Sequence, residues 1–332
     1  MFKDYKFNLK EFIGSLGDLG VLIPLSVALI LLNGVNPTSL FFVVGLLYFI
    51  TGIYFKIPFP VQPMKAMAVI AIVTNAKPEV LSAAGIIMGI ILILLSVTKL
   101  INFIHKLFTL PIVRGIQFGL GIMLIINGIK LIIGNHQSHN IFPLSFGFVI
   151  PNFGFPDIQS FVLAFSTLVL PQLPVTIGNS VIATVDTAQK YFNEKSSKVT
   201  SVAITTSLGI ANIISGVLGG MPVCHGAGGL TAHYKFGART GGANIMLGSI
   251  FIIAAIFLGK SIANIFSLIP FSILGSLLIY TGIKHAQLIQ DLFGQKEKLF
   301  FATAVGLLCV VSDMSVAIGV GLSCSFLLKK LI

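Results

Sequence analysis

One short stretch, Pro58-Phe-Pro-Val-Gln-Pro-Met-Lys-Ala66, interrupts a chain whose neighbouring segments are almost continuously apolar. Proline ends or begins a helix, and a helix broken within lipid leaves backbone groups that need new partners. A plain loop between two membrane helices suits Pro58 and Pro60, but it does not explain why Gln62 and Lys65 lead into another apolar run. The stretch therefore predicts a half-helix that starts near Gln62 inside the membrane.

The amino end of such a half-helix attracts anions. Its free N–H groups and the positive end of the helix dipole would point at the membrane midplane, where Lys65 adds a full positive charge. A lysine near a span end can also extend to the membrane surface, which is the ordinary alternative. A lysine at the start of a helix opposes the dipole but suits a bound anion, so we predict that Gln62 and Lys65 bind one.

A second stretch of the same kind lies in the other half of the chain. Met221-Pro-Val-Cys-His-Gly-Ala-Gly-Gly229 is small and polar where a membrane helix is normally apolar. Ile50-Thr-Gly52 precedes the first Pro-Val pair, and Ile214-Ser-Gly216 precedes the second. Later segments end in Gly128-Ile-Lys130 and Gly282-Ile-Lys284. Repeated halves with interrupted helices at matching positions are typical of the substrate site of a secondary transporter.

Composition places the whole chain in a membrane. Of its 332 residues, 55% are hydrophobic and 9% are charged, whereas a soluble domain has about 25% charged residues. The net charge of +11 comes from basic residues that stand singly or in pairs between apolar runs, which indicates membrane topology rather than nucleic-acid binding. The three cysteines, Cys224, Cys309 and Cys324, have no zinc-like spacing, so we expect neither disulfides, nor a metal site, nor a cofactor.

The apolar runs predict twelve membrane crossings. The predicted spans cover about residues 12–32, 39–55, 59–74, 80–100 and 111–133 in the first half, and 158–188, 201–218, 219–234, 241–258, 265–283, 299–311 and 315–328 in the second. Residues 1–134 would form the first repeat, 135–157 an extracellular connecting loop and 158–332 the second repeat. Within the loop, the apolar residues 141–150 either stay outside the membrane or make a single re-entrant pass.

The distribution of positive charge predicts the orientation. With a cytoplasmic N-terminus and twelve crossings, 17 of the 21 lysines and arginines fall inside, Lys65 lies within the membrane, and Lys77, Lys130 and Lys260 fall outside. The positive-inside rule is obeyed, which predicts a multi-pass protein of the cytoplasmic membrane with both termini in the cytoplasm. Because five crossings precede the loop, the two halves have opposite orientations and form an inverted repeat.

The segment 170–184 is the next candidate region, because we expect Pro171 and Pro174 to break its helix. It carries four polar side chains close together: Gln172, Thr176, Asn179 and Ser180. The last three fall on one helical face at spacings of three and four. Such a face can hold two helices together, or it can offer hydroxyl and amide donors to an oxyanion. We favour the oxyanion site, because the prolines would free backbone groups nearby.

Two titratable residues are candidates for carrying a coupling proton. Asp18 lies among glycines near the start of the first span, where an interfacial acid or a helix cap is the ordinary alternative. His225 follows the second Pro-Val pair, where it is either a packed polar residue or a proton sensor opposite Lys65. The second amino end of the anion site would consist of His225, Gly226, Ala227 and Gly228.

An enzyme is not expected. The run from His225 to Gly229 resembles the oxyanion motif of lipases, but the chain has no G-x-S-x-G sequence to supply a nucleophile. We therefore assign no catalytic residue.

Four motifs together resemble the molybdate transporter family, which is related to the sulfate permease (SulP) superfamily. They are Gly14-Ser-Leu-Gly-Asp-Leu-Gly20, Pro58-Phe-Pro-Val-Gln-Pro-Met-Lys65, Leu170-Pro-Gln-Leu-Pro-Val-Thr-Ile-Gly-Asn179 and Met221-Pro-Val-Cys-His-Gly-Ala-Gly-Gly229. The resemblance implies an all-α membrane fold shared with uracil and sulfate permeases, in which two inverted repeats of seven spans form a core domain and a gate domain. In that fold, the third and tenth spans each contain a short strand and a half-helix that meet at the substrate.

Carried over to this chain, the resemblance places the core domain at about residues 12–106 plus 158–260, and the gate domain at about 107–134 plus 261–332. The chain departs from the pattern in having twelve predicted spans rather than fourteen, with the missing pair in the first gate half. It also ends without the cytoplasmic regulatory domain of sulfate permeases, as molybdate-type members do.

The resemblance and the anion site together predict a secondary active transporter of a tetrahedral oxyanion that takes up molybdate, coupled to a proton or another cation. A sulfate or other anion transporter of the same fold is the first alternative, and an anion channel or a non-transporting sensor is an alternative of another class. The expected partners are the oxyanion, a coupling proton or cation, the lipid bilayer and a second copy in a homodimer, but no nucleic acid.

Overall fold

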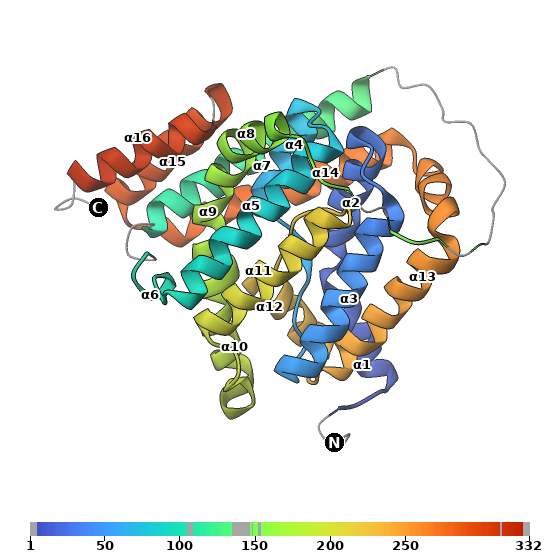
Figure 1. Ribbon diagram of the computed structural model, residues 1–332. Helices are drawn as coiled ribbons and strands as arrows, with labels where there is room; N and C mark the ends of the chain where they lie inside the picture. The colour runs from blue at the N-terminus through green and yellow to red at the C-terminus, as the bar shows by residue number, and fades with distance from the viewer. Residues whose placement is uncertain are drawn as a thin grey trace.

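The chain folds into a bundle of long helices that encloses two short strands (Figure 1). The structure is a computed structural model that describes residues 5–104, 109–134, 147, 149–151, 154–312 and 314–327. The first half contains α1 (Leu9–Ser15), the 3-10 turn η1 (Leu16–Asp18), α2 (Leu19–Asn33), α3 (Pro37–Phe55), β1 (Gln62–Pro63), α4 (Lys65–Thr74), α5 (Pro78–Val97), α6 (Ile101–Ile104) and α7 (Leu110–Ile133).

The second half opens with one long helix, which six described α-helices follow. It contains α8 (Ile158–Ala164), η2 (Phe165–Val169), α9 (Leu170–Val175), η3 (Thr176–Ile182), α10 (Ala183–Phe192), η4 (Asn193–Ser196), α11 (Ser201–Val217), β2 (Val223–Cys224), α12 (Ala227–Phe236), α13 (Gly242–Ser267), α14 (Phe271–Ala286), η5 (Gln287–Leu292), α15 (Lys296–Val311) and α16 (Met314–Leu327).

Both interrupted spans consist of a two-residue strand followed by a ten-residue helix. The strands β1 and β2 pair antiparallel with Gln62 opposite Cys224, and the Met64 N–H donates to the Pro222 carbonyl at 2.8 Å. The prolines remove backbone donors and favour extended backbone, so a helix cannot run through these segments. Each strand then satisfies backbone groups that the other broken helix leaves free.

The helix that runs from Ile158 to Phe192 does not break at its prolines, so the predicted break at residues 170–174 is wrong. The two segments that flank α9, η2 and η3, are π-helical. A π turn holds more residues than an α turn, and such wide turns absorb the missing N–H groups and the rings of Pro171 and Pro174 while the helix continues.

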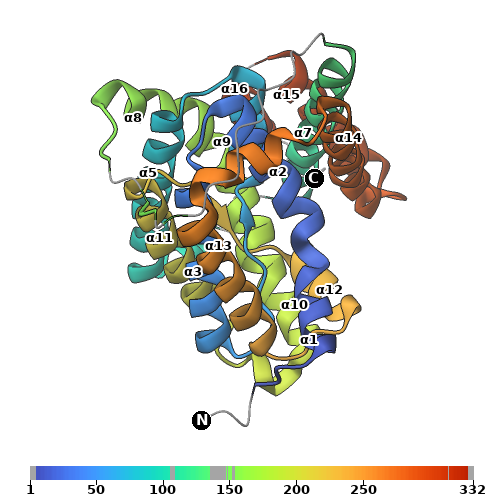
Figure 2. The ribbon, with the colours of Figure 1, turned by 90° about the vertical axis from the view of Figure 1, so that its right-hand side faces the viewer.

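Glycines allow several helix pairs to pack closely. α3 packs on α13, α5 on α11 and α7 on α14. A Cβ on Gly45 of α3 would lie 2.8 Å from the carbonyl oxygen of Gly248 in α13, and Gly121 and Gly282 face each other in the same way between α7 and α14. Small residues at helix crossings are a common basis of association in membranes. Figure 2 shows α7, α14 and α15 together at one edge of the molecule.

One predicted turn is not formed. α13 continues from Gly242 to Ser267, through the loop expected at residues 259–264. Gly259 serves packing instead of a turn, because a Cβ there would collide with the Thr38 hydroxyl of α3. Lys260, which we expected in an outside loop, therefore lies within a helix.

Six described helices are long and apolar enough to cross a membrane: Leu9–Asn33, Pro37–Phe55, Pro78–Val97, Leu110–Ile133, Ile158–Ser196 and Gly242–Gly259. The chain is therefore a multi-pass membrane protein. The total of twelve crossings, the inverted repeat and the orientation of the termini stay predictions. Most of the connecting loop, including residues 141–146, lies outside the described residues.

Candidate functional site

The paired strands bring the two half-helices together. β1 leads into α4 at Lys65, β2 leads into α12 at Ala227, and Gln62 of one strand lies opposite Cys224 of the other. Because the strands are antiparallel, the two helices begin close to one pairing and leave it in different directions. Two amino-terminal helix ends, each with a positive dipole, therefore lie beside the same strand pair.

The amino end of α4 carries a charge but has little free backbone. The Lys65 side chain is only 9% exposed, and its ammonium makes no hydrogen bond or ion pair with any residue that the structure describes. The N–H groups of Ala66 and Met67 donate to Oε1 of Gln172 on α9, at 2.8 and 3.1 Å. The Gln172 Nε2 in turn donates to the Thr176 hydroxyl at 2.9 Å. Gln172 therefore caps α4, and its amide oxygen and one of its two amide N–H groups are engaged.

The amino end of α12 is different, because it has no charge and no cap. The residue before it, Gly226, is extended, and no side chain among the described residues accepts a hydrogen bond from the first turn. Gly228 is exposed, and a Cβ placed on it would meet no atom within 4 Å. An uncapped first turn with an exposed glycine has the geometry of an anion site at a helix amino end.

Two polar side chains of η3 complete this region. The half-buried Asn179 directs its amide nitrogen toward Gly226, 3.5 Å from where a Cβ on that glycine would lie. The buried Ser180 hydroxyl lies near the Cys224 thiol and makes no hydrogen bond of normal geometry among the described residues. Both groups can donate to a ligand that lies against the strand pair.

Asp18 closes the other side of the site. Its side chain is 2% exposed, and its Oδ1 accepts a hydrogen bond from Nε2 of Gln62. The Asp18 Oδ2 and the Gln62 Oε1 are both buried without a partner in the described part of the chain. Gly229 packs against this pair, since a Cβ on it would lie 2.6 Å from both Asp18 Oδ1 and Gln62 Nε2. The carboxylate is also within electrostatic reach of Lys65.

The His225 ring is already engaged by the fold. Its Nδ1 donates to the Pro60 carbonyl at 2.8 Å, its Nε2 lies 3.3 Å from the Ser207 hydroxyl of α11, and its ring packs edge-on against Phe59 with centroids 4.6 Å apart. Neither ring nitrogen is left to contact an anion. The predicted roles of His225 as ligand and proton carrier stay untested predictions, and this packing favours a structural role.

Two features of the site were missed from the sequence. Cys224 lies opposite Gln62, and its thiol donates to the Pro63 carbonyl at 3.4 Å. Because side chains alternate along a strand, the sequence could have indicated that Cys224 and His225 point to opposite sides. The cap that Gln172 provides could not have been found in this way, because it joins residues 106 positions apart.

Comparison with known proteins places the chain among transporters. The profile of a family described as "Molybdate transporter of MFS superfamily" matches residues 10–124 and 164–284. Molybdate transporter 2 of Arabidopsis thaliana is 26% identical, with 96% of this chain and 87% of that protein covered. Molybdate transporter 1 of the same plant is 28% identical, with 87% and 81% covered.

Solved structures have the same fold at low sequence identity. The transmembrane domain of BicA, a cyanobacterial bicarbonate transporter, superimposes with a TM-score of 0.66 at 13% identity, covering 93% of this chain and 96% of that one. The murine anion transporter Slc26a9, a member of solute carrier family 26, superimposes with a TM-score of 0.68 at 14% identity, covering 99% of this chain and 69% of that one. Identities this low establish the fold alone.

Proposed function

The chain belongs to the molybdate transporter family, and on that premise we propose that it takes up molybdate across the cytoplasmic membrane. The proposal rests mainly on the Lys65 ammonium, which is buried and has no ion-pair partner among the described residues. It lies beside the uncapped amino end of α12. An isolated buried charge is costly, so a site of this kind is favourable when it holds an opposite charge. A tetrahedral dianion would supply that charge.

In this proposal, the groups around the strand pair replace the hydration shell of the anion. Lys65 supplies the charge, and the N–H groups of Ala227, Gly228 and Gly229 supply fixed donors along the dipole of α12. Asn179 and Ser180 supply neutral donors from η3. Gln62 and Gln172 act indirectly, because the first holds Asp18 and the second caps α4.

Transport requires that this site be exposed alternately to the two sides of the membrane. We propose that a core domain at about residues 12–106 plus 158–260 moves against a gate domain at about 107–134 plus 261–332. The packing supports this proposal: α3 packs on α13, α5 on α11 and α7 on α14, and β1 pairs with β2, as an internal two-fold relation between the halves would require. Inverted repeats of this kind place the substrate site at the repeat interface.

Uptake of a dianion needs a coupling cation. The membrane potential opposes entry by about 2.3 kcal/mol per charge per 100 mV. We propose that Asp18 carries a proton, because its buried carboxyl keeps one oxygen without a partner among the described residues and lies next to both Gln62 and Gly229. A dianion binds beside this carboxyl more readily when the carboxyl is protonated. Binding of the anion is therefore coupled to binding of the proton.

The site assignment is tested by uptake of labelled molybdate into proteoliposomes. Lys65→Ala should reduce uptake to background, because the anion loses the only full positive charge that the described residues place at the site. Lys130→Ala removes an exposed lysine of α7 and should transport like the wild type. Uptake by Lys65→Ala at the wild-type level would end the assignment, and competition with sulfate in the same assay distinguishes the two oxyanions.

The coupling assignment is tested with a pH gradient. Asp18→Asn keeps the acceptor for Gln62 but cannot exchange a proton, so molybdate uptake should no longer respond to acidification of the outside. Glu79→Gln at the exposed start of α5 should keep the wild-type response. An unchanged pH response in Asp18→Asn would assign the proton to another group.

A further inference from the structure

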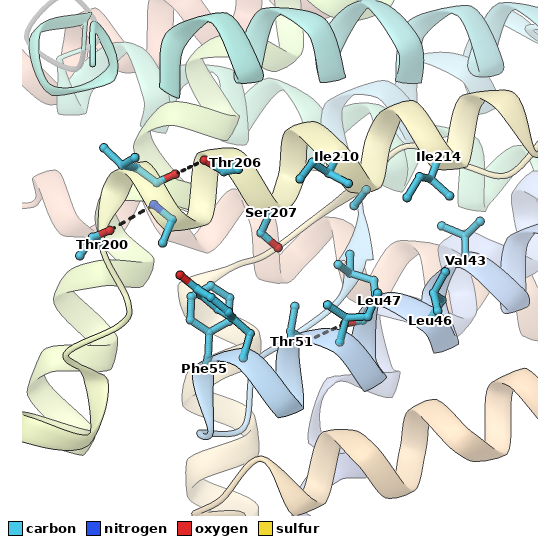
Figure 3. A pocket seen from close by; sticks show the side chains of 15 residues that line it. Val43, Leu46, Leu47, Thr51, Phe55, Thr200, Thr206, Ser207, Ile210 and Ile214 are labelled. Atoms are coloured by element: carbon cyan, nitrogen blue, oxygen red, sulfur yellow. Dashed lines mark hydrogen bonds between the residues drawn. The ribbon is translucent and has the colours of Figure 1, made fainter. Parts of the chain in front are cut away.

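A cavity lies between α3 and α11 (Figure 3). Its volume is about 470 Å³. The side chains at its mouth include Ile50, Tyr54 and Ile210, each about half exposed on the outer surface of the helices. On a membrane protein these outer positions face lipid, so the cavity opens sideways to the bilayer. Its inner wall includes Ser207, whose hydroxyl contacts the His225 ring.

The cavity changes in character along its length. Figure 3 shows Val43 and Leu46 facing Ile214 at one end, and Thr200, Thr206 and Phe55 at the other. α3 and α11 run in opposite directions here, so the carboxyl end of α3 and the amino end of α11 together form the polar end. An amphiphile would lie in it with a fixed orientation.

The threonine hydroxyl groups of the wall do not offer a polar binding site. Thr51 donates to the carbonyls of Leu47 and Tyr48, and Thr206 donates to that of Val202. Thr200 accepts from the backbone of Ala203 as the cap of α11. With these groups satisfied internally, the wall is an apolar surface to a ligand, which suits a hydrocarbon chain and does not suit a hydrated anion.

A positive charge stands at the polar end. The Lys198 Nζ lies 5.3 Å from the centre of the Tyr54 ring, which lines the cavity, and Lys198 has no ion-pair partner among the described residues. The amino end of α11 adds the positive end of a helix dipole on the same side. The charge at the mouth therefore complements a negative headgroup.

From this arrangement we infer that the cavity between α3 and α11 binds one acyl chain of an anionic membrane phospholipid, with its phosphate beside Lys198. The bound chain would separate α3 from α11 and support the wall behind His225, whose Nδ1 holds the Pro60 carbonyl just before β1. This lipid would thus be a structural ligand next to the anion site, and the inference does not rest on the identity of the transported anion.

Photolabelling in nanodiscs tests the inference. The probes are phosphatidylglycerol and phosphatidylcholine, each with a photoreactive group in the middle of one acyl chain. The phosphatidylglycerol probe should label residues 43–54 and 203–214 about fivefold more strongly than the phosphatidylcholine probe, the factor expected for one lysine at a membrane surface. Lys198→Gln should make the two probes equal, while Lys190→Gln, which removes an exposed lysine of α10, should keep the difference.

A second test of the inference is to fill the cavity with larger side chains. Ala203→Phe and Ile214→Phe each enlarge a side chain of the wall and should abolish the labelling. Ile53→Phe, at an exposed position of α3 that does not line the cavity, should leave it unchanged. Labelling that is equal for the two probes in the wild type, that is spread evenly over all lipid-facing helices, or that survives both filled variants would overturn the inference.

Discussion

The two half-helices begin in the same way but offer different chemistry to a ligand. α4 starts at a buried lysine, and two of its first N–H groups are taken by Gln172. α12 starts at Ala227 between glycines, without a charge and without a cap. One amino end therefore contributes a full charge, and the other contributes unoccupied backbone donors. A carrier for a dianion benefits from both, because charge provides attraction and fixed donors provide orientation.

The difference also explains how the site is stable when it is empty. Two uncapped helix ends and a lysine would together place much positive potential in a buried region. The Gln172 cap occupies two N–H groups at α4, and Asp18, when it is ionised, places a negative charge within electrostatic reach of Lys65. The first turn of α12 has no such cap, and Gly228 within it is exposed. We therefore expect variants of α12 to change binding and variants of the α4 cap to change the electrostatics of the site.

The largest effect is expected from the tightest point of α12. In Gly229→Ala, the new methyl group would lie 2.6 Å from Asp18, Gln62 and Pro60, so molybdate binding should be lost and the thermal midpoint should fall. Gly319→Ala, in the exposed part of α16, is the matched control, because its methyl group enters open space away from the strand pair and should leave both nearly unchanged. Calorimetry and thermal unfolding of the two variants measure the contrast. Equal tolerance of both changes would show that Gly229 is not packed against Asp18.

A charge introduced at the α4 cap should have the next largest effect. The carboxylate of Gln172→Glu can still accept from Ala66 and Met67, so the fold should remain, but it places a negative charge near the anion. An opposing interaction on the order of 3 kcal/mol at an intermediate dielectric would weaken molybdate binding roughly a hundredfold. Gln189→Glu adds the same charge farther along this helix and should bind normally. Normal affinity in Gln172→Glu would place the anion away from α4.

Removing a single donor from α12 should have a smaller effect. Proline is well tolerated at the first position of a helix, and Gly226 before it is already extended, so Ala227→Pro should fold while losing one N–H group. A hydrogen bond to a charged group contributes about 1.5–3 kcal/mol, so affinity should fall at least about tenfold. Ala227→Ser retains the N–H group and should bind like the wild type. Unchanged affinity in Ala227→Pro would mean that this donor does not contact the anion.

The sequence was most informative where the chain is punctuated by proline and glycine. The start of α4 within the proline-rich stretch, the end of α7 at Ile133 and the start of α11 at Ser201 all agree with the apolar pattern to within a few residues. Membership of the molybdate transporter family is confirmed by the family profile, and the fold matches those of BicA and Slc26a9. These features are local, because proline and glycine constrain the backbone at their own positions.

What the sequence could not provide depends on contacts between distant residues. Gln172 looked like a donor to an anion, but its amide is engaged by α4 and Thr176. Pro171 and Pro174 looked like a break, but π-helical turns absorb them. His225 looked like a ligand, but Pro60 and Ser207 hold its ring. The break at the prolines is therefore wrong, while the ligand roles of Gln172 and His225 stay predictions, and the tertiary partners of these two side chains favour structural roles.

Diffraction from crystals grown with tungstate tests the central claim most directly, because this tetrahedral dianion can be located by the anomalous scattering of tungsten. The account predicts one strong peak within contact distance of the Lys65 ammonium and the N–H groups of Ala227 to Gly229, and no such peak in crystals of Lys65→Ala. A peak elsewhere in the protein, with none between these two helix ends, would contradict it.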